Sequence, residues 1–176
     1  MGLFLTNLDN QTRPLMVDEI QADIKSGKLY LSQRLNSQGQ KDYPNLLLTA
    51  AQYRDDMWLA DELRKGRLNA TEQARKPSGG YITKKVPINA AETLAEGEFN
   101  RFYIRGLFKR AIGNGIADLV IYRAKQVTNP RSDSAAKIGT TINAQTLLSD
   151  LRINIGIDTA LGLPPGPNSG LSVRLP

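Results

Sequence analysis

The 176-residue chain contains neither histidine nor cysteine. Without histidine it has no imidazole to act as a general base, to complete a Ser-His-Asp triad or to ligate a metal. Without cysteine it has no thiolate nucleophile, no disulfide and no thiolate-bound zinc or iron–sulfur cluster. An enzyme built from this chain would have to use carboxylates, Lys, Tyr, Ser, Thr or Arg. We therefore expect a protein that is not an enzyme, with no catalytic residue, metal site or cofactor.

The sequence also lacks a long apolar run, because no stretch approaches the roughly 20 residues that a membrane span needs. Residues 1–6 include an apolar patch but no basic region before it, so we expect no secretory signal. The hydrophobic share of 40% and the charged share of 23% are typical of soluble globular proteins. A chain of this length favours one domain with a small additional segment.

The net charge of +6 is distributed unevenly along the chain. Residues 64–85 and residues 99–131 each carry a net charge of +6, and the remainder carries −6. Such an uneven distribution of charge affects association with partners more than it affects the fold. It favours a partner with an acidic protein surface or with phosphates.

Hydrophobic periodicity and capping residues predict an α+β fold, with several short helices and one long basic-aromatic helix packed on a small sheet. Helices are expected from Asp9 or Thr12 to Gly27, from Pro44 onward, from Asp55 to Gly66, over about 90–112, and near 144–151 after a capping Asn143. The sheet is expected to combine residues 81–86, residues 117–124 and the terminal strand, while residues 36–40 and 67–80 read as loops. We expect one domain over 1–160, with a helical part at 9–66 and a mixed part at 81–151.

The long helix carries a ridge of positive charge. Arg101, Arg105 and Lys109 follow one another at intervals of four residues, and Arg110 is adjacent. Like charges at this spacing destabilise a helix by about 0.2–0.5 kcal/mol per pair, so an acidic group is expected to compensate. One interpretation is an interaction surface for phosphates or an acidic protein. The other is a core helix whose basic edge is solvated or pairs with the chain's own acids.

Residues 161–176 form a different kind of segment, which we expect to be an extended C-terminal arm. Its first part is rich in Pro and Gly and favours a stiff, extended chain. Its second part alternates apolar and polar residues, as an edge strand does. The segment either returns as an edge strand of its own domain or adds a strand to a neighbouring subunit. The residues expected to make the contacts are Pro164, Pro165, Pro167, Leu171, Val173 and Leu175.

These features together favour a non-enzymatic structural subunit of a large assembly that docks neighbours through its termini. The most concrete form is a tailed-phage virion component, such as a capsid decoration, neck or tail-adaptor protein, located in the virion or otherwise in the cytoplasm. Its partners would be other protein subunits in an oligomer, with nucleic-acid phosphates as a further contact. The first alternative is a nucleic-acid-binding module that uses the basic helix. The second is a carboxylate-dependent hydrolase, in which the i,i+4 neighbours Glu92 and Glu96 share a cation.

Overall fold

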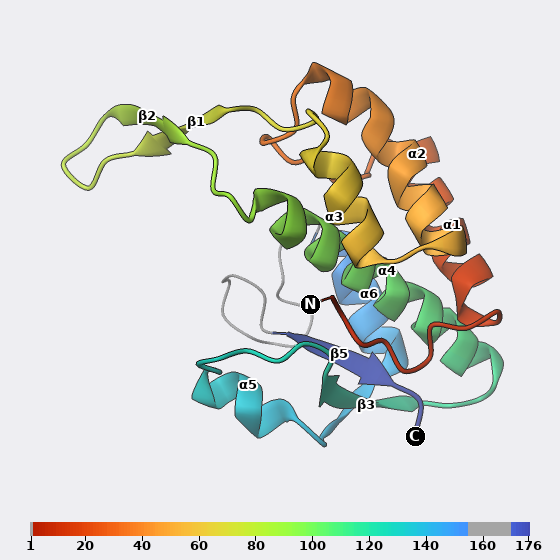
Figure 1. The fold of residues 1–176 in the computed structure, drawn as a ribbon. Coiled ribbons are helices and arrows are strands. Elements are labelled where there is room, and N and C mark those ends of the chain that lie inside the picture. The colour runs from red at the N-terminus through yellow and green to blue at the C-terminus, as the bar shows by residue number, and fades with distance from the viewer. Residues whose placement is uncertain (1, 155–169) are drawn as a thin grey trace.

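A computed structural model of the chain describes residues 2–154 and 170–176 and has an α+β fold, as the sequence predicts. Its central element is α4 (Ala90–Gly113), a continuous helix of 24 residues. Three helices cover one side of α4, and a sixth helix and a small sheet cover the other (Figure 1). These helices are α1 (Thr12–Lys25), α2 (Ser37–Tyr53), α3 (Asp56–Arg64) and α6 (Ala144–Ile153).

The strands form two separate antiparallel sheets. In the three-stranded sheet, β3 (Asp118–Arg123) is central, with β4 (Thr141–Asn143) and β5 (Leu171–Arg174) at its sides. The short helix α5 (Ser132–Lys137) lies between β3 and β4 in the chain. The second sheet is a hairpin of β1 (Thr71–Arg75) and β2 (Tyr81–Lys85).

This hairpin corrects two sequence predictions. Residues 67–80 are not simply a loop, because they contain β1, and residues 81–86 do not join the sheet formed around residues 117–124. The reason is the turn between the strands, in which Gly79 and Gly80 have φ angles of +89° and +79°. Such angles are readily adopted only by glycine. The chain therefore folds back at once, and β2 pairs with the segment directly before it.

The second helix begins seven residues earlier than predicted, at Ser37 instead of Pro44. Asn36 determines this start, because its side chain accepts a 2.8 Å hydrogen bond from the backbone N–H of Gly39 and so caps the helix. Pro44 lies inside the helix, although proline removes one backbone hydrogen bond there. At α6 the predicted cap is confirmed, since Asn143 accepts a 3.1 Å hydrogen bond from the N–H of Thr146.

The hydrophobic core lies between α4 and the elements on its two sides. On α4 it includes an almost continuous set of large side chains, each at most 1% exposed: Phe99, Phe102, Tyr103, Leu107 and Phe108. Alternate residues of the sheet meet them, namely Leu119, Ile121, Leu171 and Val173. Burying each such side chain stabilises the fold by about 1.5–3 kcal/mol. The apolar periodicity of the terminal strand thus reflects packing on α4.

The backbone of α1 passes very close to α4 at Gly106. A Cβ atom at this position would lie 2.8 Å from the backbone nitrogen of Met16 and 2.8 Å from its Cγ. Real Cβ atoms do not come this close to backbone, so only glycine allows α1 to lie where it does. Gly106 therefore permits a close helix crossing, while α4 itself continues through it.

We expect the Gly106→Ala variant to be destabilised by about 1–3 kcal/mol, because the added methyl group forces α1 away from α4. Urea denaturation would measure this difference. The matched control is Gly113→Ala, at the last residue of the same helix, where a Cβ would meet no atom within 4 Å. The control should keep or slightly increase the stability. Equal unfolding midpoints for Gly106→Ala and the wild-type protein would contradict the close-crossing argument.

Candidate functional site

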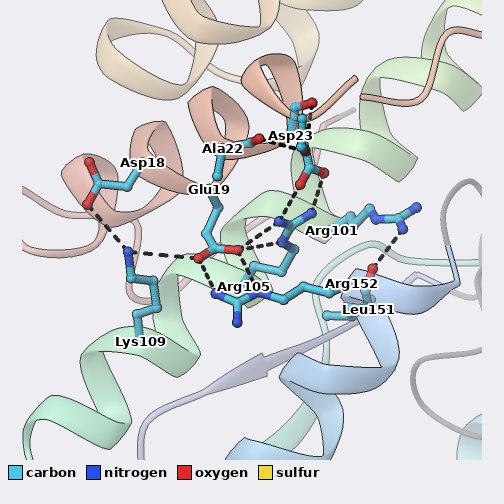
Figure 2. A network of polar contacts seen from close by, with 10 residues as sticks. Asp18, Glu19, Ala22, Asp23, Arg101, Arg105, Lys109, Leu151 and Arg152 are labelled. Carbon is cyan, nitrogen blue, oxygen red and sulfur yellow. Dashed lines mark hydrogen bonds and ion pairs between the residues drawn. The ribbon is translucent and has the colours of Figure 1, made fainter. Parts of the chain in front are cut away.

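Two helices bring their charged faces together in the interior. On α1, Glu19 and Asp23 are four residues apart, and on α4, Arg105 and Lys109 have the same spacing. Residues four apart lie on one face of a helix, so an acidic ridge can meet a basic ridge. Figure 2 shows this arrangement, with α6 contributing a further arginine. The acid that the basic ridge requires is therefore supplied by α1.

Arg105 is the centre of this ion network and is only 1% exposed. Its Nη1 and Nη2 donate to the two carboxylate oxygens of Asp23, at 2.6 and 2.8 Å, and its Nε donates to Glu19 at 2.9 Å. The guanidinium carbon also lies 4.8 Å from the ring centroid of Phe102, a cation–π distance. Burial alone would lower the pKa of Arg105, but hydrogen bonds to Asp23 and Glu19 raise it. The hydrogen bonds to the carboxylates of Asp23 and Glu19 thus keep the guanidinium charged.

Glu19 connects three helices through its two carboxylate oxygens. Besides Arg105 on α4 it binds Arg152 on α6, whose Nη2 and Nε donate to Oε1 and Oε2 at 2.6 and 3.1 Å. Lys109 lies 3.4 Å from the carboxylate of Asp18 and 3.8 Å from Glu19. Burial would raise the pKa of Glu19, but the hydrogen bonds from Arg152 and Arg105 outweigh it and lower that pKa. Glu19 therefore remains an anion inside the protein.

Arg101 ties α4 to the end of α6. Its Nη2 donates to the backbone carbonyls of Leu151 and Asn154, both at 2.8 Å. Carbonyls at a helix C-terminus are unpaired within the helix and favour a cation. The Arg101 Nη1 also lies 3.6 Å from the carboxylate of Glu98. Burial raises the pKa of Glu98 to about 7, even though Arg101 and Arg105 act to lower it.

The structure thus places the four residues of the predicted ridge against the protein itself. Arg101 and Arg105 are buried, while Lys109 and Arg110 are partly exposed. Arg110 pairs with Asp9, with its Nη1 2.8 Å from a carboxylate oxygen. This placement corresponds to the second interpretation, in which the basic edge pairs with the chain's own acids. The matching four-residue spacing of acids within residues 12–25 is the sequence signal that points to this outcome.

The two carboxylates of the hydrolase alternative are also engaged by cations of the chain. Glu92 forms an ion pair with Arg64, and Glu96 forms one with Lys125. Within residues 2–154 and 170–176, no group of three or more acidic side chains is placed to hold a metal ion. The geometry of Glu92 and Glu96 therefore adds nothing in favour of a shared cation.

The described part of the C-terminal segment is an edge strand of the chain's own sheet. Leu171 and Val173 are buried, and Leu175 is partly buried against the core. Two side chains of α4 hold the strand: Asn100 Nδ2 donates to the carbonyl of Leu171 at 2.8 Å, and the Tyr103 hydroxyl donates to that of Val173 at 3.1 Å. Of the two alternatives for this segment, the described residues match the first. Pro164, Pro165 and Pro167 lie outside the described residues.

The N-terminal segment joins the same group of contacts. Asn7 donates its backbone N–H to the Tyr103 hydroxyl at 3.2 Å, and its side-chain oxygen accepts from the N–H of Leu175 at 2.9 Å. Three residues earlier, the carbonyl of Phe4 accepts a 2.7 Å hydrogen bond from the Tyr122 hydroxyl. The two chain ends are therefore linked to each other and to α4.

The β1–β2 hairpin is the feature that sequence reasoning missed. It extends away from the helical body (Figure 1), and no residue of either strand belongs to the hydrophobic core. Its base is held by Glu72, which accepts from Arg34 Nε at 2.6 Å and lies 3.1 Å from Lys84 Nζ. The hydrogen bond from Arg34 lowers the pKa of Glu72 most, and the contact with Lys84 lowers it further. The hairpin is thus anchored at its base and free of the core along its length.

Comparisons with known proteins do not assign the chain to a group. No protein-family model matches it, and no curated protein or solved structure matches it either. Among the helices that the structure describes, none is long and apolar enough to cross a membrane. The ion network and the hairpin are therefore the features of the chain that bear on its function.

We expect the Arg105→Met variant to lose about 3–5 kcal/mol of stability, because it leaves Asp23 without its buried partner. Guanidinium or urea titration would measure the loss. The control is Lys109→Met, on the same face of α4 but partly exposed, which should change stability by about 1 kcal/mol or less. If both variants unfolded at the wild-type midpoint, the network would not stabilise the fold.

Glu98 predicts a specific pH dependence. Its folded pKa of about 7 lies above the ordinary glutamate value of 4.5, so the folded state retains this proton longer than the unfolded state. The resulting stabilisation is complete below pH 4.5 and is lost as the pH rises to 7, a loss of about 3 kcal/mol. In Glu98→Gln this dependence should disappear, so urea denaturation should show the variant gaining relative to the wild type between pH 5 and pH 8. A stability difference that is the same at both pH values would refute the assignment.

Proposed function

We propose that the chain is a non-enzymatic structural subunit of a homo-oligomeric assembly and docks on a neighbouring copy through the β1–β2 hairpin. The observation that carries this proposal is the hairpin itself, which projects from the body (Figure 1). All five residues of β2 are exposed, and β1 alternates between exposed and half-buried. A projecting element of this kind suits contact between subunits.

Two-stranded hairpins need support from outside. Alone in water they are marginally stable at best, and a third strand or another packed surface is needed to stabilise them. The core of this chain does not supply that surface. A neighbouring copy with the same hairpin would provide such a surface.

One face of the hairpin has aliphatic side chains available for such a contact. Because side chains alternate along a strand, Ala74 and its cross-strand partner Ile82 share a face with the ion-paired Glu72 and Lys84, and we call this the aliphatic face after its first two members. Ile82 is 41% exposed, and Ile88, just beyond β2, is 98% exposed. Large aliphatic groups gain free energy when a partner removes them from water. The aliphatic face and Ile88 are therefore the proposed contact.

The proposed docking element is the hairpin and not the chain termini. The sequence favoured docking through the termini, but the described terminal residues bind one another and α4. The ion network holds α1, α4 and α6 together, and Arg34 orients the base of the hairpin. A rigid body with an oriented projection suits a subunit that must meet its neighbour in one geometry.

For the assembly itself we keep the form that the sequence favours, a tailed-phage virion component assembled in the host cytoplasm. The polarised charge supports this choice, because one basic block lies on and around the exposed hairpin. Capsid decoration, neck and tail-adaptor positions all fit a subunit of this kind. The proposed partners are copies of the chain and other virion subunits.

We expect the wild-type protein to have a native mass that is a multiple of 19.4 kDa, and Ile82→Asp/Ile88→Asp to reduce it to that of a monomer. Size-exclusion chromatography with light scattering would measure both. The matched control is Ile138→Asp/Ile153→Asp, since these isoleucines are similarly exposed, at 42% and 76%, but lie elsewhere. The control should assemble normally. A monomeric wild type, or a double hairpin variant of unchanged mass, would contradict the proposal.

A further inference from the structure

The side of the hairpin opposite the aliphatic face has a different chemistry. Its residues are all exposed, and we call them the basic face: Thr71, Gln73, Arg75, Tyr81, Thr83 and Lys85. In the antiparallel register Arg75 lies directly across from Tyr81, and Lys85 across from Thr71. The basic face thus has a cation near each end and includes no acidic residue.

The cations of this face are not neutralised within the chain. In the described residues no ion pair engages Arg75 or Lys85, and the same is true of Lys76 at the hairpin tip. The rest of the same basic block differs, because Arg64, Lys65, Arg67 and Lys84 all pair with acidic side chains. The unbalanced charge of residues 64–85 is therefore concentrated on the hairpin.

We propose that the basic face binds the phosphate backbone of double-stranded DNA. Phosphate oxygens in protein–DNA complexes accept hydrogen bonds from Arg and Lys and from Ser, Thr, Gln and Tyr side chains. Every residue of the basic face is one of these types. Its uncompensated cations would displace the counterions that surround duplex DNA, which is the main source of sequence-independent binding.

The composition of this face favours DNA over an acidic protein. Protein interfaces have a desolvated apolar centre, and lysine is depleted there. On the basic face the single aromatic ring, Tyr81, is flanked by polar groups, and no aliphatic side chain is present. The aliphatic groups of the hairpin lie on its other face or beyond β2. The two faces are thus suited to different kinds of partner.

The shape of the hairpin supports the same assignment. The major groove of B-form DNA is about 12 Å wide and admits a two-stranded β-ribbon. The hairpin is a ribbon of this type, and it projects clear of the helical body (Figure 1). The narrow, deep major groove of A-form RNA does not admit side chains in this way. Duplex DNA is therefore the partner that matches both the charge and the geometry.

This inference goes beyond the proposed oligomeric role and uses the opposite face of the hairpin. DNA binding by one copy does not require a second copy. A monomeric wild type would refute the oligomer while leaving DNA binding measurable. Conversely, an oligomer that ignores DNA would refute only the present inference.

The test is fluorescence anisotropy with a labelled 20-base-pair duplex of mixed sequence, over a series of salt concentrations. We expect Arg75→Gln/Lys85→Gln to weaken binding on the order of 10- to 100-fold near 0.1 M salt and to reduce the slope of log K against log salt by about 2. The matched control, Lys25→Gln/Lys28→Gln, removes the same charge from exposed residues near the end of α1. It should alter affinity by about threefold or less.

Three outcomes would overturn the inference. The wild-type protein could fail to bind the duplex even at low salt. The hairpin variant could bind as tightly as the control, which would place the contact elsewhere. Poly-glutamate could displace the duplex at equal charge concentration, which would assign the basic face to an acidic protein. Circular dichroism and native mass would establish that both variants keep the wild-type fold and oligomeric state.

Discussion

The structure depends on the buried contact between Arg105 and the two acids of α1, Glu19 and Asp23. Removing three charged groups from water is costly, and only close, multiple hydrogen bonds offset the cost. Those bonds form in one relative position of α1 and α4, which Gly106 allows by giving α1 room. Arg152 then extends the same constraint to α6. The network therefore specifies how the helices are arranged, while the surrounding aromatic residues supply most of the hydrophobic stabilisation.

The cations of α4 and those of the hairpin have different roles in this structure. On α4 the arginines face acids or helix-terminal carbonyls and act within the fold. On the hairpin, Arg75 and Lys85 face solvent, without an acidic partner among the described residues. The same residue types thus stabilise the body in one place and remain available for a partner in the other. Within the described residues, the projecting hairpin thus carries cations that no acid of the chain neutralises.

Local features of the fold were largely predictable from the sequence. The long helix, the cap at Asn143 and the strand around residues 171–174 follow from periodicity and capping chemistry, which act over a few residues. The hairpin was missed because β1 has the sequence Thr-Glu-Gln-Ala-Arg, which has little strand preference. Its conformation is decided by pairing with β2 across a tight glycine turn. The start of α2 was missed because the cap at Asn36 outweighs the usual preference of proline for the first turn.

The sequence by itself excluded imidazole and thiolate side chains and determined the α+β class and the uneven distribution of charge. It also required that an acid compensate the ridge on α4, because repeated like charges on one helix face repel. Only the tertiary structure decided that Glu19 and Asp23 are those acids, since they lie more than 80 residues away along the chain. The four-residue spacing of arginines along a helix is the same whether their side chains face water or a carboxylate, so the spacing alone does not show which of the two they face. Burial and pairing are properties of the packed chain, so only the tertiary structure identifies the hairpin as an exposed basic element.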